Sequence, residues 1–462
     1  MENTRRDEVD LIFLTCIIAV NCSDVEVTMI RIQQIKLAAD CKDERAALLK
    51  KAAKLLRMEP ASIQSLSIVK RSIDARKKPD ICRVYTVDVK VAGEQAVLRK
   101  LRGKNGQMQL VEETAYCFPG FEGMAGDDGR KTEAIAGRKT IMGETSLGQG
   151  RPVIVGTGPA GLFCGYMLAK AGLRPLLLER GKEVHKRRED VERFWREGVL
   201  DPGSNVQFGE GGAGTFSDGK LTTTVKDPKG RMRKVLRIFV EAGAPEEILY
   251  EAKPHIGTDI LIHVIENLRR QILEWGGEVR FESQMTALLM EEDRTAGTST
   301  QNRRIAGVSV NGEEIRSSVV VLAIGHSARD TFRMLHELQV PMEAKSFAVG
   351  LRMEHPRDII DRMQYGDCGL LLPAAVYKVT AQTASGRGVY SFCMCPGGYV
   401  VNASSEPGRT TVNGMSYSGR DGTNSNSAMI VTVSPEDYEA YGGTGPLAGI
   451  AFQRHLEERA YE

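Results

Sequence analysis

Residues 151–181 read RPVIVGTGPAGLFCGYMLAKAGLRPLLLERG, and the expected architecture of the chain follows from this segment. It starts with the apolar run 153–155, passes through a GxGxxG pattern into a helix-like segment, and ends in PLLLERG, which predicts a second strand. A strand, a glycine-rich turn, a helix and a second strand in this order make a βαβ unit. The sequence therefore predicts a dinucleotide-binding turn in an α/β domain.

The residue types in this unit match the needs of a dinucleotide. Gly156 permits the tight turn out of the strand, Gly158 lets the backbone approach a pyrophosphate, and Gly161 lets the helix pack against the sheet. Pro159 suits the first turn of the helix, whose free N–H groups favour phosphate. Glu179 ends the second strand, where an acid binds the ribose hydroxyls and repels a 2′-phosphate, so NADP is disfavoured.

A second GxGxxG pattern occurs at residues 209–214, as GEGGAG. No apolar strand precedes it, and the segment TFSDGKL that follows it does not have a helical pattern. We therefore interpret it as a loop. A glycine-rich loop beside a nucleotide fold is typically a ligand-contacting segment.

The composition is that of an ordinary globular protein, with 42% hydrophobic and 26% charged residues in 462. This length allows two or three domains. The net charge of +2 is unevenly distributed, because residues 29–104 hold 19 Lys and Arg against 8 Asp and Glu. One part of the chain is therefore a basic module.

The nine cysteines are scattered and show no zinc-like spacing, so no metal site is expected. A reduced, cytoplasmic setting follows as the default. The apolar run 11–20, LIFLTCIIAV, is too short to span a bilayer and follows an acidic flank. Neither a membrane helix nor a signal peptide is expected, and Met29 is an alternative start.

Taken in order, the chain predicts an α/β fold with a Rossmann-like domain, an inserted antiparallel substrate domain and a small α+β module at the N-terminus. The expected divisions are an extension 1–28, a basic ferredoxin-like module 29–105, a linker 106–150, a Rossmann-like domain 151–345, an antiparallel substrate domain 346–440, and a segment 441–462 that returns to the Rossmann-like domain. Within it, Thr258 or Asp259 is expected to cap a long helix, and 319–324 to form a buried parallel strand.

Several motifs together resemble a known family. They are VGTGPAGL with LLLERG, NVQFGEGGAGTFSDGKL, HIGTDIL, VVLAIGHSARDT, GLRMEHP and FCMCPGG, and they extend over nearly the whole chain from Met29. The chain resembles the uncharacterised FAD-dependent dehydrogenases of the glutathione-reductase-like flavoprotein superfamily, whose members have two dinucleotide-binding domains. The resemblance implies FAD at the βαβ unit, contacted by Gly156, Gly158, Pro159, Ala160, Gly161, Glu179, Arg180, Met285, Ala323 and Gly325.

One feature departs from that pattern. Superfamily members end with a further glycine-rich segment that contacts the flavin, and this sequence stops at Glu462 without it. We therefore expect the C-terminal FAD segment to be missing from this chain. A chain shortened in this way would hold flavin weakly and purify with less than one FAD per protein.

The expected function is an FAD-dependent oxidoreductase that acts on a small molecule, with NAD(P)H or another external electron donor or acceptor. The candidate catalytic residues are Cys393 and Cys395, two residues apart on a strand, and His255. Further candidates, each balanced against an ordinary structural role, are His326, His355, Asp218, Lys220 and Arg352.

The alternative function is a flavin-binding scaffold whose basic module engages RNA or an acidic protein. Its candidate segment is KRSIDARKKPD, residues 70–80. No aromatic residues suited to RNA stacking accompany it, so a solvated loop is the favoured interpretation and a nucleic-acid partner is not expected.

Overall fold

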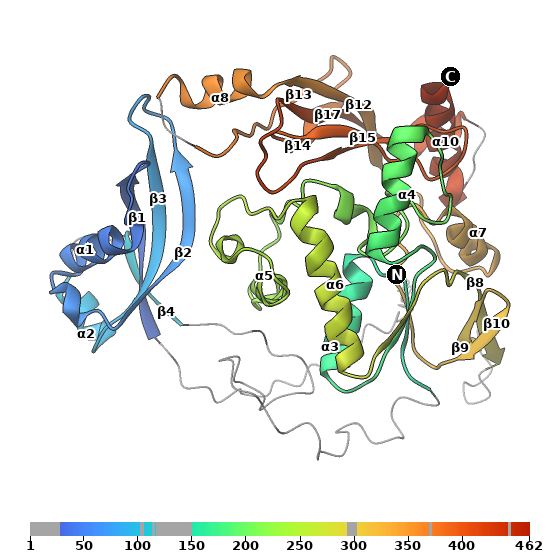
Figure 1. Ribbon diagram of the computed structural model, residues 1–462, viewed down its shortest axis with the longest axis horizontal. Coiled ribbons are helices and arrows are strands. Elements are labelled where there is room, and N and C mark those ends of the chain that lie inside the picture. The colour runs from blue at the N-terminus through green and yellow to red at the C-terminus, as the bar shows by residue number, and fades with distance from the viewer. Residues whose placement is uncertain are drawn as a thin grey trace, which may run out of the picture.

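The computed structural model describes residues 28–101, 106–112, 116, 150–292, 303–368, 372–441 and 445–462. Figure 1 shows an N-terminal module on the left, a central α/β domain and an antiparallel sheet above it. The predicted α/β fold class is confirmed. The expected extension before Thr28 and most of the expected linker lie outside the described residues. No helix in the described ranges has both the length and the apolar character of a membrane span.

The N-terminal module is a four-stranded antiparallel sheet with two helices, and its strand order β2-β3-β1-β4 is the ferredoxin-like one. The core between sheet and helices includes Ile30, Leu48 and Val87. The last strand lies within the stretch expected to be a linker, so the module continues past residue 105. Its elements are β1 (Thr28–Ala38), α1 (Glu44–Leu56), η1 (Pro60–Ser62), β2 (Ser65–Asp74), β3 (Cys82–Lys90), α2 (Glu94–Lys100) and β4 (Met108–Glu112).

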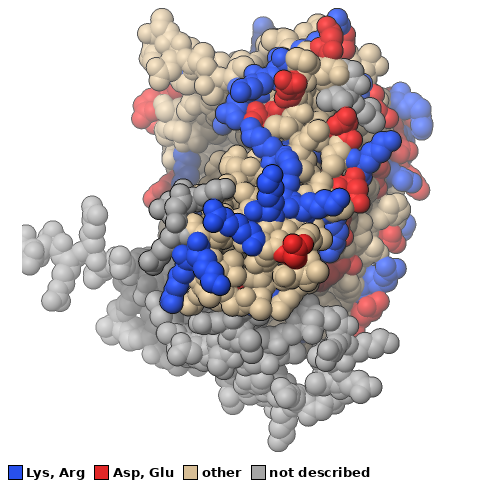
Figure 2. All heavy atoms as spheres, turned by 90° about the vertical axis from the view of Figure 1, so that its left-hand side faces the viewer, with Lys and Arg blue, Asp and Glu red and all other residues tan. Residues whose placement is uncertain are grey.

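The outer face of this module is basic: Figure 2 shows a band of Lys and Arg side chains on the side that faces left in Figure 1. Part of the basic segment 70–80 nevertheless contacts the rest of the chain. The backbone of Arg71 exchanges hydrogen bonds with Tyr250 and Ala252 (2.7 and 2.8 Å), and its Nε donates to Glu251 (2.6 Å). Lys78 donates to the carbonyl of Met363.

The central domain has a parallel sheet in the order β11-β5-β6-β7, as a βαβ-based fold requires. A separate antiparallel sheet, β10-β9-β8, adjoins it. The elements are β5 (Val153–Val155), α3 (Pro159–Lys170), β6 (Leu176–Leu178), α4 (Val184–Glu197), η2 (Gly212–Phe216), α5 (Arg231–Glu241), η3 (Glu246–Leu249), α6 (Thr258–Glu274), β7 (Glu278–Arg280), β8 (Met285–Glu292), β9 (Arg303–Val310), β10 (Glu313–Arg316), β11 (Val320–Leu322) and α7 (Arg329–Glu337).

Two local expectations were wrong. Helix α6 begins after Gly257 without a side-chain cap, because the Thr258 hydroxyl donates to the carbonyl of Thr215 (2.6 Å) and the Asp259 carboxylate accepts from Ser418. Strand β11 is parallel to β5 as expected, but it is only half-buried and Leu322 is exposed. For α6 the tertiary contacts of the two side chains replace the cap, whereas β11 is half-buried because it is the edge strand of its sheet.

The third body is the expected antiparallel sheet, in the order β12-β17-β14-β13, with a small hairpin β15-β16 beside it. Phe452 of the last helix packs against Tyr438 and Val433, and Glu457 pairs with Arg329 of α7 (2.6 Å). The elements are β12 (Phe347–Pro356), α8 (Arg357–Tyr365), β13 (Thr380–Gln382), β14 (Gly388–Cys395), β15 (Tyr399–Asn402), β16 (Val412–Met415), β17 (Asn424–Val433), α9 (Pro435–Glu439), η4 (Gly445–Leu447) and α10 (Ala448–Tyr461).

Candidate functional site

A cavity of about 400 Å³, here called the nucleotide cavity, lies at the carboxyl ends of β5 and β6. This is the edge of a parallel sheet at which nucleotide ligands bind. Of the ten residues expected to contact the cofactor, all but Gly161 line it, which brings together Gly156, Gly158, Pro159, Ala160, Glu179, Arg180, Met285, Ala323 and Gly325.

The three motif glycines have different roles in this cavity. A Cβ on Gly156 would lie 2.4 Å from the carbonyl oxygen of Ala323, and one on Gly161 would overlap the carbonyl oxygen of Gly156. A Cβ on Gly158 would meet nothing closer than the Cα of Gly212, at 3.8 Å. Gly156 and Gly161 are therefore required by the fold, whereas the protein itself leaves room beside Gly158. Space beside a bare backbone at a helix N-terminus fits a pyrophosphate.

Glu179 lines the cavity, but the protein already uses its carboxylate fully. Oε2 accepts from the backbone N–H and the hydroxyl of Thr157 (2.9 and 2.8 Å), and Oε1 accepts from the N–H groups of Gly181 and Gly209 (both 3.0 Å). A carboxylate has about four acceptor sites, and all are filled here. Glu179 joins three loops around the cavity, and its expected contact with a ribose stays a prediction.

The glycine-rich loop that follows α4 forms one wall of the cavity. Arg187 lies under it, fully buried, and its guanidinium donates to the carbonyl oxygens of Asn205 (2.8 Å), Val206 (2.9 Å) and residue 210 (2.6 Å). Burial lowers the pKa of Arg187 to about 10, so the group remains charged at neutral pH. The side chain acts as an internal template for the loop, a role for which the sequence carries no signal.

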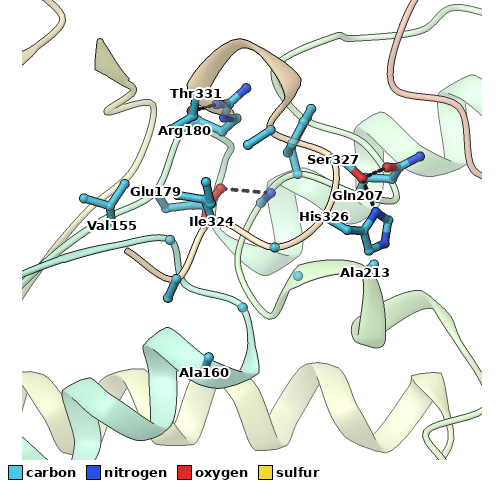
Figure 3. A pocket seen from close by; sticks show the side chains of 18 of the residues that line it. Val155, Ala160, Glu179, Arg180, Gln207, Ala213, Ile324, His326, Ser327 and Thr331 are labelled. Atoms are coloured by element: carbon cyan, nitrogen blue, oxygen red, sulfur yellow. Dashed lines mark hydrogen bonds between the residues drawn. The ribbon is translucent and has the colours of Figure 1, made fainter. Parts of the chain in front are cut away.

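The cavity has two polar sides. Figure 3 shows Glu179 and Arg180 on one side and Gln207, His326 and Ser327 on the other. Ser327 Oγ contacts His326 Nδ1 (2.8 Å) and the amide oxygen of Gln207, and burial lowers the pKa of His326. Of this second group, the sequence had singled out only the histidine.

A second cavity of about 360 Å³, here called the cationic cavity, is lined by Lys220, Lys253, Lys378 and Arg420. Asp218 lies beside it, 1% exposed, and accepts from Arg420 Nε (3.0 Å) and Lys220 Nζ (3.2 Å). Burial opposes ionisation, but the two cations outweigh it and hold the pKa of Asp218 below its usual value. The sequence had marked Asp218 and Lys220 and missed Arg420.

The two candidate cysteines lie next to this cavity. Lys220 Nζ is 3.8 Å from Cys395 Sγ, and Arg352 Nη1 donates to the carbonyl of Cys393 (3.2 Å). Strand β14 has a bulge here, with Cys393 at a φ of 48°. A hydrogen bond from Cys395 lowers the pKa of the Cys393 thiol against the effect of burial, with help from Lys220 and Arg352. The pKa of Cys395 is raised, because losing its proton would remove this hydrogen bond.

The lowered pKa predicts the pH dependence of alkylation. The thiolate is the reactive form and is populated above the pKa. Carbamidomethylation of Cys393 should therefore reach half its maximal rate at a lower pH than that of an ordinary thiol, whose pKa is about 8.5. Peptide mapping by mass spectrometry measures this, with Cys41 of the N-terminal module as internal control. Lys220→Met should move the profile to higher pH. Identical profiles for both cysteines would contradict the prediction.

The remaining candidate residues divide into two groups. His255 lies beside the cationic cavity, because its backbone pairs with that of Lys220; its Nε2 contacts the carbonyl of Ser418 (3.0 Å), and burial, then Arg420, lowers its pKa. His355 contacts the hydroxyl of Tyr377 (2.8 Å), which lines the same cavity. Lys220 is therefore a neighbour of both His255 and Cys395, whereas His326 lies at the nucleotide cavity.

Three family profiles match parts of the chain. One described as FAD-dependent protein, C-terminal domain-like, matches residues 346–462, and one described as an NAD(P)-binding Rossmann-like domain matches 154–197. A domain of unknown function matches 29–90. A relative from Clostridium beijerinckii, described as an uncharacterized protein, is 45% identical over 436 residues, which is 94% of this chain and 74% of the relative.

Solved structures give only distant likenesses. Thermovibrio ammonificans THI4 has 16% identity and a TM-score of 0.26, with 42% of this chain and 64% of that one covered. Halogenase PltM has 12% identity and a TM-score of 0.32, with 68% and 56% covered. L-amino acid deaminase from Proteus vulgaris has 12% identity and a TM-score of 0.27, with 64% of each covered. The chain spans less than two thirds of each of these structures, and the likenesses are too distant to assign an activity.

Proposed function

This chain belongs to the family of the Clostridium beijerinckii relative, and from that premise we propose that it is an FAD-dependent oxidoreductase acting on a small molecule. Its cofactor is FAD, since the FAD-dependent C-terminal domain profile and the Rossmann-like profile both match. When bound, FAD supplies two-electron redox chemistry. Placement in the glutathione-reductase-like superfamily is part of the proposal.

The nucleotide cavity supports FAD binding through its own geometry. Gly158 offers a bare backbone at the uncapped N-terminus of α3, where phosphate is favoured. Met285 is 4% exposed and forms an apolar part of the wall, which suits a flat base. Arg180, held by Asp330 (3.0 Å) and stacked over Phe208 (4.5 Å), forms the rim. We propose these residues as the cofactor contacts.

One observation carries the oxidoreductase proposal: two neighbouring cysteines, one of them 3.8 Å from the Lys220 ammonium, lie one short segment away from the nucleotide cavity. Gly214 lines the nucleotide cavity, and Lys220 both lines the cationic cavity and touches Cys395. Six residues of extended chain reach at most about 20 Å, which bounds the separation between these two positions. We therefore assign Cys393 and Cys395 as the reacting groups beside the substrate.

The stoichiometry of the thiol pair agrees with this assignment. With Cys393 as the thiolate, oxidation of the pair forms one Sγ–Sγ bond, releases the single proton of Cys395 and delivers two electrons, which is the capacity that FAD would supply when bound. His255, whose pKa is lowered by burial, is neutral at pH 7 and is the proposed proton acceptor. Lys220 keeps the Cys393 thiolate stable between turnovers.

The alternative, a scaffold that binds RNA or an acidic protein, is not supported by the contacts of its candidate segment. Arg71 and Lys78 bind other parts of the same chain, so they are already engaged. The exposed band of Figure 2 is compatible with a solvated surface.

The test is an anaerobic titration of the FAD-loaded protein. NADH, NADPH and a small dithiol are added in turn while the visible spectrum is recorded and free thiols are counted. We expect bleaching of the flavin band by at least one donor, and two fewer free thiols in the oxidised protein. Cys393→Ser should remove the change in thiol count, whereas Cys368→Ser, the matched control, should retain it. A flavin band that no donor alters would contradict the proposed activity.

A further inference from the structure

The cationic cavity carries more positive charge than its own protein partners neutralise. Asp218 pairs with Lys220 and with Arg420, and the described residues provide neither of them with another acidic partner. Lys253 and Lys378 have no hydrogen bond or ion pair to any residue in the described part of the chain. Four cations and one carboxylate leave an excess of three positive charges around one hollow.

Arg420 supplies a second, independent observation. Arg420 is only 8% exposed, and its Nε and Nη2 both donate hydrogen bonds to the carboxylate of Asp218. Within the described residues, its Nη1 has no acceptor. Because Arg420 lines the cavity, this edge of its guanidinium is open to solvent there and available to donate to an anion.

The uncharged lining is compatible with the same kind of ligand. Tyr377 and Thr222 provide hydroxyl groups, and no acidic residue is among the described residues that line the cavity. Lys253 is exposed but partly desolvated, and this desolvation, then the charge of Arg420, lowers its pKa, as expected for a cation in a positive field. An anion entering this field would gain charge-assisted hydrogen bonds from several directions.

We infer that the cationic cavity binds a small organic polyanion through its carboxylate or phosphate groups. Lysine ammonium groups act as point charges for either group, and the free edge of Arg420 adds a fixed donor at the base. A volume of about 360 Å³ suits a small molecule. The inference that this anion is the substrate rests on the proposed oxidoreductase function. The inference that the cavity binds an anion does not depend on that function.

The position of the cavity explains why such an anion would matter to the reaction. Lys220 has its Nζ 3.2 Å from Asp218 and 3.8 Å from Cys395 Sγ. An anion held at Lys220 therefore lies beside the thiol pair. The cations fix the charged end of the molecule and so place the rest of it relative to Cys393.

The experiment measures binding directly, by isothermal titration calorimetry of the FAD-loaded full chain with citrate and, separately, with inorganic phosphate. The test variant is Lys253→Gln with Lys378→Gln, and the matched control is Lys226→Gln with Lys229→Gln, which removes two exposed lysines outside the cavity. Both variants change the net charge equally, and all four positions are exposed, so folding is preserved.

We expect citrate to bind to the wild-type protein and to the control with the same affinity, and about tenfold more weakly to the test variant. The affinity should fall as NaCl is raised, because the contacts are ionic. Phosphate binding stronger than citrate binding would identify the ligand as a phosphate ester, and the reverse would identify a polycarboxylate. Absence of binding by both anions, or equal loss in the two variants, would overturn the inference.

The same titration separates this inference from the proposed function. If the protein binds citrate but no donor reduces its flavin, the inferred anion site stands and the proposed oxidoreductase function is rejected. If a donor reduces the flavin but the protein binds neither anion, the proposed oxidoreductase function stands and the inferred anion site is rejected.

Discussion

Gly158→Val is expected to weaken FAD binding by about two orders of magnitude, or roughly 2.8 kcal/mol, without unfolding the protein. The backbone at this position has φ −67° and ψ −178°, which valine adopts without strain. The added Cβ has only an ordinary contact with the protein, 3.8 Å from Gly212. The whole effect should therefore come from exclusion of the pyrophosphate.

Two other glycine variants make this result specific. Gly388→Val is the matched control, because a Cβ there meets nothing within 4 Å and the site is remote from the motif; it should bind FAD normally. Gly161→Ala should instead lower thermal stability, since its Cβ would overlap the carbonyl of Gly156. Fluorescence titration with FAD and circular dichroism distinguish the outcomes. Tight FAD binding by Gly158→Val would show that the pyrophosphate lies elsewhere.

Arg187→Met is expected to destabilise the central domain by about 3–5 kcal/mol and to loosen the loop that walls the nucleotide cavity. The substitution leaves the buried carbonyls of Asn205 and Val206 without their donor, and an unpaired buried acceptor costs about 1–3 kcal/mol. Glu179 and residue 210 also lose a nearby positive charge. The thermal midpoint should fall by about 10 °C.

The neighbouring residue provides the control for this prediction. Arg188 lies on the same helix, but it is exposed and its contact with Glu192 is 3.6 Å long. Arg188→Met should change the free energy of unfolding by less than about 0.5 kcal/mol. Arg187→Lys should recover only part of the stability, because a lysine ammonium lacks the planar, forked set of donors with which the guanidinium reaches several carbonyl groups at once. Equal midpoints for the Arg187→Met and Arg188→Met proteins would refute the assigned role.

The sequence alone was sufficient for features that depend on neighbours along the chain. The βαβ unit could be predicted because its glycines, apolar runs and terminal acid act within 31 consecutive residues. The ferredoxin-like module followed from periodicity, although its short last strand was missed: MQLVE, at 108–112, lacks a strong apolar pattern and depends on pairing with β1. Likewise, the motif itself sets the cavity positions from Gly156 to Ala160, whereas Met285, Ala323 and Gly325 were implied only by the family resemblance.

The second site was decided by tertiary structure. Asp218 and Arg420 are 202 residues apart, and neither has a local pattern that indicates the other. The partners of Arg187 are carbonyl groups, which every residue carries, so no side chain in the loop marks them. The bulge that turns Cys393 beside Cys395 arises from register against β17. Local periodicity records which face of an element is buried, whereas ion pairs and unpaired donors depend on where distant elements meet, because charge and hydrogen bonding act through space.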